Sequence, residues 1–273
     1  MASAFKGLTQ SQINKRIKEG RGQGSGADYQ PFIYVHEISP QGRVHRLFGF
    51  KTKRILHLLS DLELAIFLIL DWSPDVIDIR EQFPMNVDDT IRIAHEAGLP
   101  HWKYSGVNQV LTTDFVVSST NPEMKLFAIQ AKPAEELEKA GTIERLELER
   151  RYLEYKEIPW DIITKEDIPQ TILQNIQWLY PAQEDKLKNQ ELQHYFELFR
   201  REFQKLPDAG AISIAQRLDM SYDLENGTAL YWLRCLLAKR FFAFDMEIPY
   251  RKLLVSDLHE NAHDEPEEIH ASA

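Results

Sequence analysis

The chain has 273 residues, of which 43% are hydrophobic, and its formal net charge is −10. This length holds one large domain or two ordinary ones, and the longest apolar run, residues 62–70, is too short to cross a bilayer, so no membrane association is expected. The single cysteine, Cys235, excludes an intramolecular disulfide framework and predicts a reducing, cytoplasmic compartment.

The charge is distributed unevenly along the chain. Residues 1–54 contain ten Lys and Arg against three acidic residues, a balance of +7, which leaves −17 for the remainder. A basic N-terminal arm on an acidic body predicts phosphate contacts at one place and protein contacts elsewhere. The alternative is an arm that is merely solvated.

The first 50 residues indicate a short helix and two strands. Residues 11–18 predict a helix capped by Ser11. Residues 20–26 contain four glycines and predict a loop, which either follows a phosphate backbone or only links its neighbours. Residues 32–38 and 43–50 are typical of strands.

Residues 57–70 predict a buried helix, because they are apolar on nearly every side. Ser60 and Glu63 form the S-x-x-E pattern of a capping box. Glu63 therefore has two interpretations. It either caps the helix or, as a buried acid that needs a partner, faces a metal site.

A strand is expected at residues 76–83, where the alternating Asp78, Arg80 and Gln82 face either substrate or solvent. Residues 88–101 predict an irregular or helical excursion. His95 and His101 there lack metal-ligand spacing and are expected at the surface.

Residues 112–133 predict a β-hairpin, with apolar runs at 115–117 and 126–129 around a Ser-Ser-Thr-Asn-Pro turn. Asp114 stands at the head of the first strand, and Gln130 and Lys132 share one face at the end of the second. This is the D-x(n)-(E/D/Q)-x-K pattern of metal-dependent nucleases. Oxygen ligands hold Mg²⁺, and the lysine places a point charge beside the attacking water. An ordinary hairpin with solvated polar ends is the alternative.

A charged helix is expected at residues 143–156, with Thr142 as its cap. Glu149 shares a stripe with Leu146 and Leu153. It could therefore assist a second metal or orient Lys132. An ion pair with Arg145 or Arg150 is the favoured alternative. A strand follows at residues 159–164. The order of elements predicts an α/β domain with a mixed sheet flanked by helices.

Beyond residue 165 the chain is mostly helical. Helices are expected at 169–178 and 186–206, with Pro181 breaking between them, then at 211–218 and 224–239, before an aromatic strand at 241–246. Helix, turn, helix and strand is the order of a winged helix. Its second helix carries only Arg234, Lys239 and Arg240 as cations, which favours binding protein over reading DNA. The acidic tail, residues 259–273, is expected to be disordered; metal binding by its His259, His263 and His270 is the alternative.

A series of motifs runs along the chain: RIKEGRGQG at residues 16–24, then LLSDLELAIFL, DIREQFP, TTDF, AIQAKP, LELERRY and IPW, and finally NIQWLY at residues 175–180. In order and spacing, these motifs resemble those of TnsA, the endonuclease subunit of heteromeric cut-and-paste transposases. The resemblance implies a restriction-endonuclease-like catalytic domain, residues 1–168 with the basic arm, and a winged-helix domain, residues 169–258. It implies a catalytic trio of Glu63, Asp114 and Lys132. It further implies Mg²⁺, replaceable by Mn²⁺, held by Glu63, Asp114, Gln130 and the main-chain carbonyl of Ala131.

The same resemblance implies a role in bacterial DNA transposition. Such an enzyme hydrolyses phosphodiesters at the 5′ ends of a transposon, while a TnsB-type transposase cuts the 3′ ends and a TnsC-type ATPase regulator couples the pair to a target. The winged-helix domain is the expected contact for the regulator. Two alternatives remain at this point: a non-catalytic assembly factor that bridges transposase and regulator, and a stand-alone restriction or repair nuclease.

Overall fold

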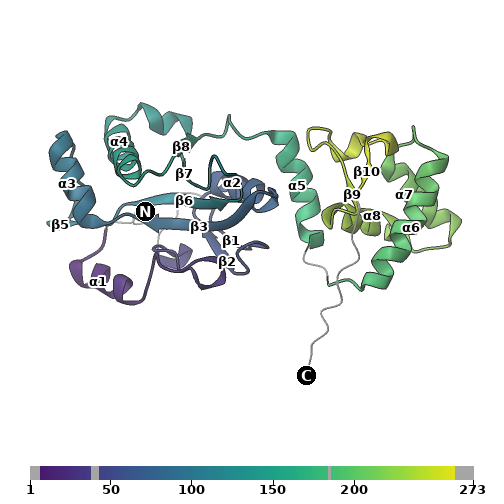
Figure 1. The fold of residues 1–273 in the computed structure, drawn as a ribbon, viewed down its shortest axis with the longest axis horizontal. Coiled ribbons are helices and arrows are strands. Elements are labelled where there is room, and N and C mark those ends of the chain that lie inside the picture. The colour runs from purple at the N-terminus through teal and green to yellow at the C-terminus, as the bar shows by residue number, and fades with distance from the viewer. Residues whose placement is uncertain (1–6, 38–42, 184–185, 262–273) are drawn as a thin grey trace, which may run out of the picture. The chain divides into compact units, whose positions relative to one another are not determined.

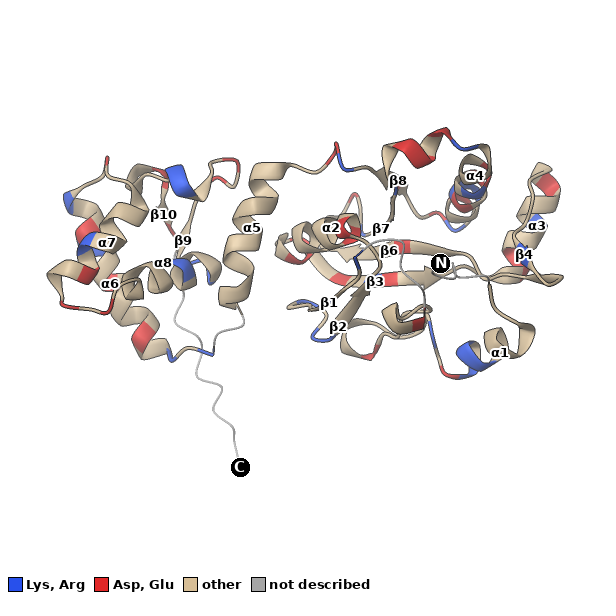
Figure 2. Ribbon diagram, turned by 180° about the vertical axis from the view of Figure 1, so that it is seen from behind, with Lys and Arg blue, Asp and Glu red and all other residues tan. Residues whose placement is uncertain are grey.

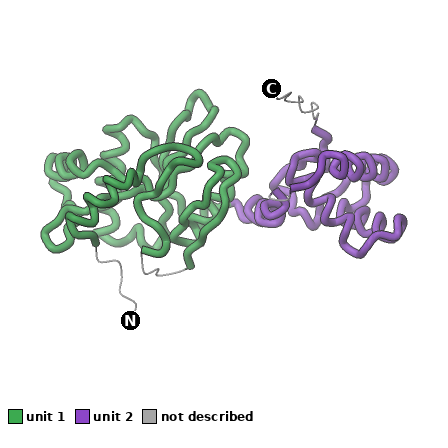
Figure 3. The backbone as a smooth tube through the Cα atoms, turned by 90° about the horizontal axis from the view of Figure 1, so that it is seen from below, with its two compact units in different colours: residues 1–168 green, residues 169–273 purple. Residues whose placement is uncertain are grey.

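The computed structural model describes residues 7–37, 43–183 and 186–261. The chain divides into two compact units, residues 1–168 and 169–273 (Figure 3). Each unit is described by itself. Within the described ranges, no helix is long and apolar enough to cross a membrane.

The first unit is built on a four-stranded sheet of order β3-β6-β7-β8 (Figure 1). Its strands are β3 (Val76–Pro84), β6 (Thr112–Ser119), β7 (Leu126–Ala131) and β8 (Trp160–Ile163). The first three strands are antiparallel, and β8 runs parallel to β7. The helix α4 (Ala140–Tyr155) provides the crossover that a parallel connection requires. The predicted mixed sheet flanked by helices is confirmed.

Helices cover the sheet through an apolar cluster. The helices α3 (Val87–Ala97) and α4 pack on one face, where Val116 of β6 and Ala128 of β7 meet Leu148 and Leu153 of α4. Nearly every residue of β6 is buried, as expected for a central strand covered on both faces. Gly98 ends α3 in the left-handed conformation, with φ of 65°. Thr142 lies inside α4, which begins at Ala140, so its predicted capping role is wrong.

A basic hairpin precedes the first buried helix. The strands β1 (His45–Phe48) and β2 (Ile55–Leu58) pair antiparallel, and α2 (Asp61–Trp72) follows with Ser60 as its N-cap. The predicted helix start at His57 is wrong, because residues 57 and 58 pair with β1. The strand predicted at residues 32–38 is also wrong: Val35–Glu37 form a 3-10 turn, and residue 38 lies outside the described residues.

The N-terminal segment is folded against the first unit. The helix α1 (Gln10–Lys18) is capped by Thr9, which exchanges hydrogen bonds with Gln12, rather than by Ser11. The glycine-rich loop closes on itself, because Gly22 N–H donates to the Gln30 carbonyl at 2.6 Å. A further 3-10 turn, Gly26–Asp28, follows it. The loop is therefore folded rather than a flexible linker, and its contact with a phosphate backbone stays a prediction.

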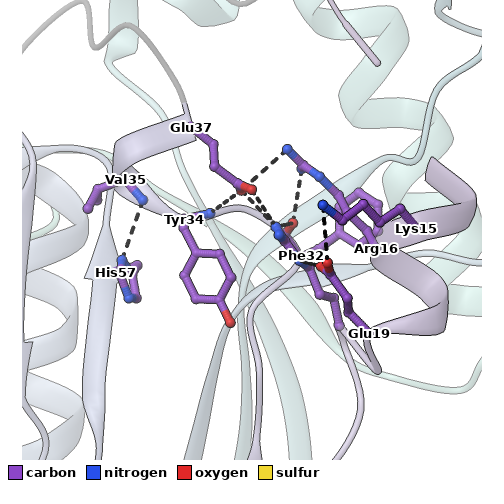
Figure 4. A network of polar contacts seen from close by, with 9 residues as sticks. Lys15, Arg16, Glu19, Phe32, Tyr34, Val35, Glu37 and His57 are labelled. Carbon is purple, nitrogen blue, oxygen red and sulfur yellow. Dashed lines mark hydrogen bonds and ion pairs between the residues drawn. The ribbon is translucent and has the colours of Figure 1, made fainter. Parts of the chain in front are cut away.

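Two cations of the basic arm have structural roles (Figure 4). The Arg21 guanidinium binds Glu37 at 2.7 Å, and Arg16 lies 3.3 Å from the same carboxylate. Both arginines also donate to the Phe32 carbonyl. Lys18, in contrast, is exposed. Other basic residues of the arm are exposed on α1, Lys15 and Lys18, and on the β1–β2 hairpin, Arg46 and Lys53; Figure 2 shows the basic positions of both elements in blue.

Smaller elements complete the first unit. They are a hairpin of β4 (Lys103–Tyr104) and β5 (Val107–Asn108), and a 3-10 turn, Ala134–Glu138, between β7 and α4. Gln109 holds the start of the described chain to this hairpin, because its side chain bonds to both the N–H and the carbonyl of Leu8.

Within its described residues, the second unit consists of four α-helices and a two-stranded sheet. The elements are α5 (Gln170–Gln183), α6 (Asn189–Lys205), α7 (Ala211–Ser221), α8 (Thr228–Ala238), β9 (Phe242–Ala243) and β10 (His259–Glu260), with 3-10 turns at Tyr250–Lys252 and Val255–Asp257. Pro181 lies in the last turn of α5 rather than between two helices, so the predicted break is wrong. In that turn, a proline forfeits only one helical hydrogen bond.

The predicted disorder of residues 259–273 is wrong at its start. His259 and Glu260 form β10, which pairs with Ala243 and Phe242 of β9. This strand pairing holds residues 259 and 260 to the rest of the second unit. Residues 262–273, including His263 and His270, lie outside the described residues.

The Arg21–Glu37 pair generates a prediction about stability. Arg21→Gln should lower the free energy of unfolding by about 2 kcal/mol, because it removes charge-assisted hydrogen bonds to a half-buried carboxylate. The matched variant Lys18→Gln, on the same basic segment, should change it by less than about 0.5 kcal/mol. Urea denaturation of both variants measures the difference. If both variants change the free energy of unfolding equally, the Arg21–Glu37 pair contributes nothing specific to stability.

Candidate active site

The structure brings four of the five sequence-predicted site residues into one connected cluster. Glu63 lies in the first turn of α2, Asp114 in β6, and Gln130 and Ala131 at the end of β7. Each of the four is less than 10% exposed. The fifth, Lys132, follows β7 directly, and its N–H donates to the Ile163 carbonyl of β8 at 3.0 Å.

Strand register explains how the hairpin residues meet. Phe115 pairs with Ile129, so the next residues, Asp114 and Gln130, face each other across the two strands. The Asp114 N–H donates to Gln130 Oε1 at 3.1 Å, and Asp114 Oδ2 accepts from the Ala131 N–H at 2.8 Å. The orientation of the Asp114 carboxylate is therefore set by the backbone of the neighbouring strand.

Glu63 is both a helix-capping residue and a member of the cluster. The Ser60 hydroxyl accepts from the Glu63 N–H at 3.1 Å and donates to Glu63 Oε1 at 3.0 Å, while the Leu59 N–H donates to Glu63 Oε2 at 2.9 Å. These bonds hold the carboxylate in the first turn. The capping interpretation is thus confirmed without excluding the other one.

The surroundings of Glu63 disfavour its ionised form, because the side chain is buried and Asp114 lies nearby. Burial, and next the charge of Asp114, raise the pKa of Glu63 to about 8, while the charge of Lys132 acts in the opposite direction. Two buried carboxylates in such proximity need a proton or a cation between them.

A divalent cation suits the donors present. Within the described residues, no group of three or more His, Cys, Asp or Glu side chains is placed to hold a metal. A cation here would therefore combine the two carboxylates with amide and carbonyl oxygens, which are the hard donors that Mg²⁺ prefers. The residues present fit such an ion, because its charge would compensate that of the buried Glu63 and Asp114.

Glu149 of α4 is buried beside this cluster, being 2% exposed. The Trp160 indole N–H donates to Glu149 Oε1 at 3.0 Å, and burial above all raises the pKa of Glu149 to about 7. The favoured ion pair with Arg150 is wrong, because Arg150 binds Glu147 and Glu154 instead. Arg145 influences Glu149 only through its charge.

A pocket of about 540 Å³ opens beside the cluster. Three cations line it: Arg43, Lys132 and Arg145. Glu149 and Ser60 also line it, so the pocket reaches the residues around the two carboxylates. Asp61 and Glu136 line the pocket as well, so its cations are interspersed with acids; the three cations are the groups suited to a phosphate of a nucleic acid backbone.

Sequence reasoning did not identify Gln82 as part of the cluster. Its amide nitrogen lies 3.3 Å from Glu63 Oε2 and 3.4 Å from Asp114 Oδ1, so it contacts both carboxylates. Gln82 is 2% exposed, so it does not face solvent as one of the two expectations had it; that it faces substrate stays a prediction. Strand alternation and the DIREQFP motif point to this glutamine, but neither places it between Glu63 and Asp114, because that position depends on the backbone conformation of β3.

The raised pKa of Glu149 generates a prediction about pH dependence. Its neutral form contributes stability that is fully present below about pH 4.5 and is lost as the pH rises through 7. Glu149→Gln removes this loss and keeps an acceptor for Trp160. In EDTA, the variant should therefore gain about 3 kcal/mol relative to the wild type between pH 4.5 and pH 8. Denaturant titrations across this range measure the difference, and parallel pH profiles would contradict the assignment.

Comparison with known proteins agrees with this geometry. Residues 73–165 match the family described as TnsA-like endonuclease N terminal, and residues 167–246 match TnsA endonuclease C terminal. The chain is 43% identical over 258 residues to the transposon Tn7 transposition protein TnsA of Escherichia coli, covering 94% of each protein. The resemblance seen in the sequence is confirmed. The chain belongs to the TnsA endonuclease family.

Proposed function

We propose that this endonuclease hydrolyses DNA phosphodiesters with Mg²⁺, for which Mn²⁺ substitutes. The ion would be held by the side chains of Glu63, Asp114 and Gln130 and by the carbonyl of Ala131. When bound, it would polarise the phosphate and lower the pKa of a water molecule. The observation that carries the proposal is the burial of Glu63 beside Asp114, a pair that needs either a proton or a cation.

The chain's own residues supply orientation and charge. Asp114 is oriented by the Ala131 N–H, and Glu63 is oriented by the first turn of α2. Gln130 Oε1 accepts one hydrogen bond from Asp114 N–H and retains a lone pair for a ligand. Lys132 would orient the attacking water or stabilise charge on the phosphate, since it lines the pocket beside Glu149.

Access of DNA to the site would depend on the cations of the pocket. Arg43 is 80% exposed at its side chain and is tethered to Asp61 at 2.8 Å, so it can exchange that partner for a phosphate. Arg145 lines the same pocket. These cations, together with exposed lysines of the N-terminal segment, would hold the backbone without reading base sequence.

The proposed biological role is cleavage at the 5′ ends of a transposon in the bacterial cytoplasm. A TnsB-type transposase would cut the 3′ ends, and a TnsC-type ATPase regulator would connect both to a target. The relative named above is a transposon transposition protein, which supports this assignment.

The second unit, which we propose to be a winged-helix domain, would contact the regulator. Two cations of its α8 region are already bound within the unit: Arg234 donates to the Trp178 carbonyl and Lys239 to the Gln183 carbonyl. They are therefore poorly available for reading base edges. Met220 and Tyr222 near the end of α7 are 79% and 50% exposed, which favours a protein partner.

Strand-specific mapping of nicks on a transposon-end substrate tests this function. The purified chain in Mg²⁺ should not cut at a defined site, because it offers no convincing base readout. Addition of a TnsB-type transposase should produce paired 5′ and 3′ cuts. With Asp114→Asn, which can still accept from the Ala131 N–H, only the 3′ cuts should remain. Site-specific cutting by the isolated chain at physiological salt would instead indicate a restriction-type nuclease.

Lys132 should affect turnover and not metal binding, because an ammonium cannot ligate a cation. Lys132→Ala and Lys132→Arg should each slow 5′ cleavage about 100-fold or more, since the planar guanidinium does not replace a compact charge. Titration calorimetry with Mn²⁺ should give wild-type affinity for both. Lys139→Ala is the matched control, because Lys139 is exposed and binds only Glu136 among the described residues. Normal cleavage by both Lys132 variants would remove this residue from the proposed site.

A further inference from the structure

Gln82 has an unusual backbone for a strand residue. It lies within β3, yet its φ is 48°, in the left-handed region that residues other than glycine rarely adopt. Such a conformation is strained and persists only where the surroundings impose it. One of those surroundings is the N-terminal segment, because the Phe32 N–H donates to the Gln82 carbonyl at 3.2 Å.

Strand register directs this residue toward the site. Glu81 pairs with Phe115 and Phe83 pairs with Thr113, so Gln82 stands opposite Asp114. The neighbouring Glu81 is fully buried and binds Arg54 instead. Gln82 is therefore the β3 residue that contacts the two carboxylates. The strained backbone thus coincides with the position of the cluster.

The Gln82 amide is oriented by its hydrogen bonds. Its oxygen accepts from the Thr112 hydroxyl at 3.4 Å. Its nitrogen therefore faces Glu63 Oε2 and Asp114 Oδ1, at 3.3 and 3.4 Å. The reverse orientation would lose the bond from Thr112 and set the amide oxygen against Asp114 Oδ1 and against Glu63 Oε2, which already accepts from the Leu59 N–H. A single NH₂ group bridges the two acids.

We infer that Gln82 is a positioning residue for the metal site, whose NH₂ group sets the relative orientation of the Glu63 and Asp114 carboxylates. This inference rests on the proposed function. Other donors hold the second oxygen of each acid: Ser60 for Glu63, and the Ala131 N–H for Asp114. Gln82 is the contact that joins the two acids, so that their remaining lone pairs converge on one cation.

The role differs from ordinary core packing in what its loss would change. A packing residue contributes to the free energy of unfolding wherever it lies. A bridge between two ligands contributes in addition to metal affinity, because unbridged carboxylates must be reordered before they bind. Metal affinity is therefore the quantity that separates the two roles.

The test is titration calorimetry of the full chain with Mn²⁺, at a temperature where every variant is folded. Gln82→Met keeps the length of the side chain and removes the donor. Gln82→Asn keeps the donor and tolerates the left-handed backbone, but shortens its reach. Each variant should bind Mn²⁺ about tenfold or more weakly than the wild type. If Gln82→Met does not fold, Gln82→Asn decides the question alone.

Gln109→Met is the matched control, because Gln109 is equally buried and none of its hydrogen bonds reaches the cluster. It should lower thermal stability while Mn²⁺ affinity stays within about twofold of the wild type. Wild-type affinity in the Gln82 variants, or equal losses in the Gln109 variant, would overturn the inference. If Asp114→Asn binds Mn²⁺ as tightly as the wild type does, the proposed function is overturned, and the inference with it.

Discussion

Two carboxylates, Glu63 and Asp114, are buried together, and this concentration of negative charge is the constraint around which the first unit is organised. Burial alone raises the free energy of each ionised group, and the proximity of the second raises it further. The protein meets this cost with N–H and amide donors from the residue before the N-cap of α2, from β3 and from β7, and with a pKa of Glu63 raised to about 8. Two buried carboxylates held in this way are better suited to binding a cation than to packing in a core.

Each structural feature around the site supplies one part of that arrangement. Pairing of β6 with β7 sets Asp114 against Gln130, and the N-cap of α2 sets Glu63. The parallel addition of β8, which needs the α4 crossover, brings Trp160 and Glu149 to the same region. The proposed site thus depends on the mixed sheet, because no single element carries more than two of these residues.

The basic residues of the N-terminal segment divide into two groups with different roles. Arg16 and Arg21 neutralise Glu37 and bind the Phe32 carbonyl, and the Phe32 N–H in turn binds the Gln82 carbonyl. This chain of contacts connects the segment to the strained residue beside the carboxylates. The cations nearest the site are instead those of the pocket, and they come from positions far apart in the sequence. The net charge of −10 describes the whole chain, whereas Arg43, Lys132 and Arg145 gather around one pocket.

Local patterns in the sequence were sufficient to predict the hairpin, its Asp114–Gln130 juxtaposition, the Ser60 cap and the mixed sheet, since alternation and turn chemistry set strand register and capping over a few residues. Other features depended on contacts between residues distant in the chain. These were the 3-10 turn at Val35–Glu37, the burial of Arg16 and Arg21, the Trp160 partner of Glu149 and the first residues of the supposed tail. Gln82 is the clearest case. Its role follows from a positive φ within a strand, and only the packed tertiary structure, in which Asp114, Thr112 and Phe32 surround it, imposes a conformation that local propensity opposes.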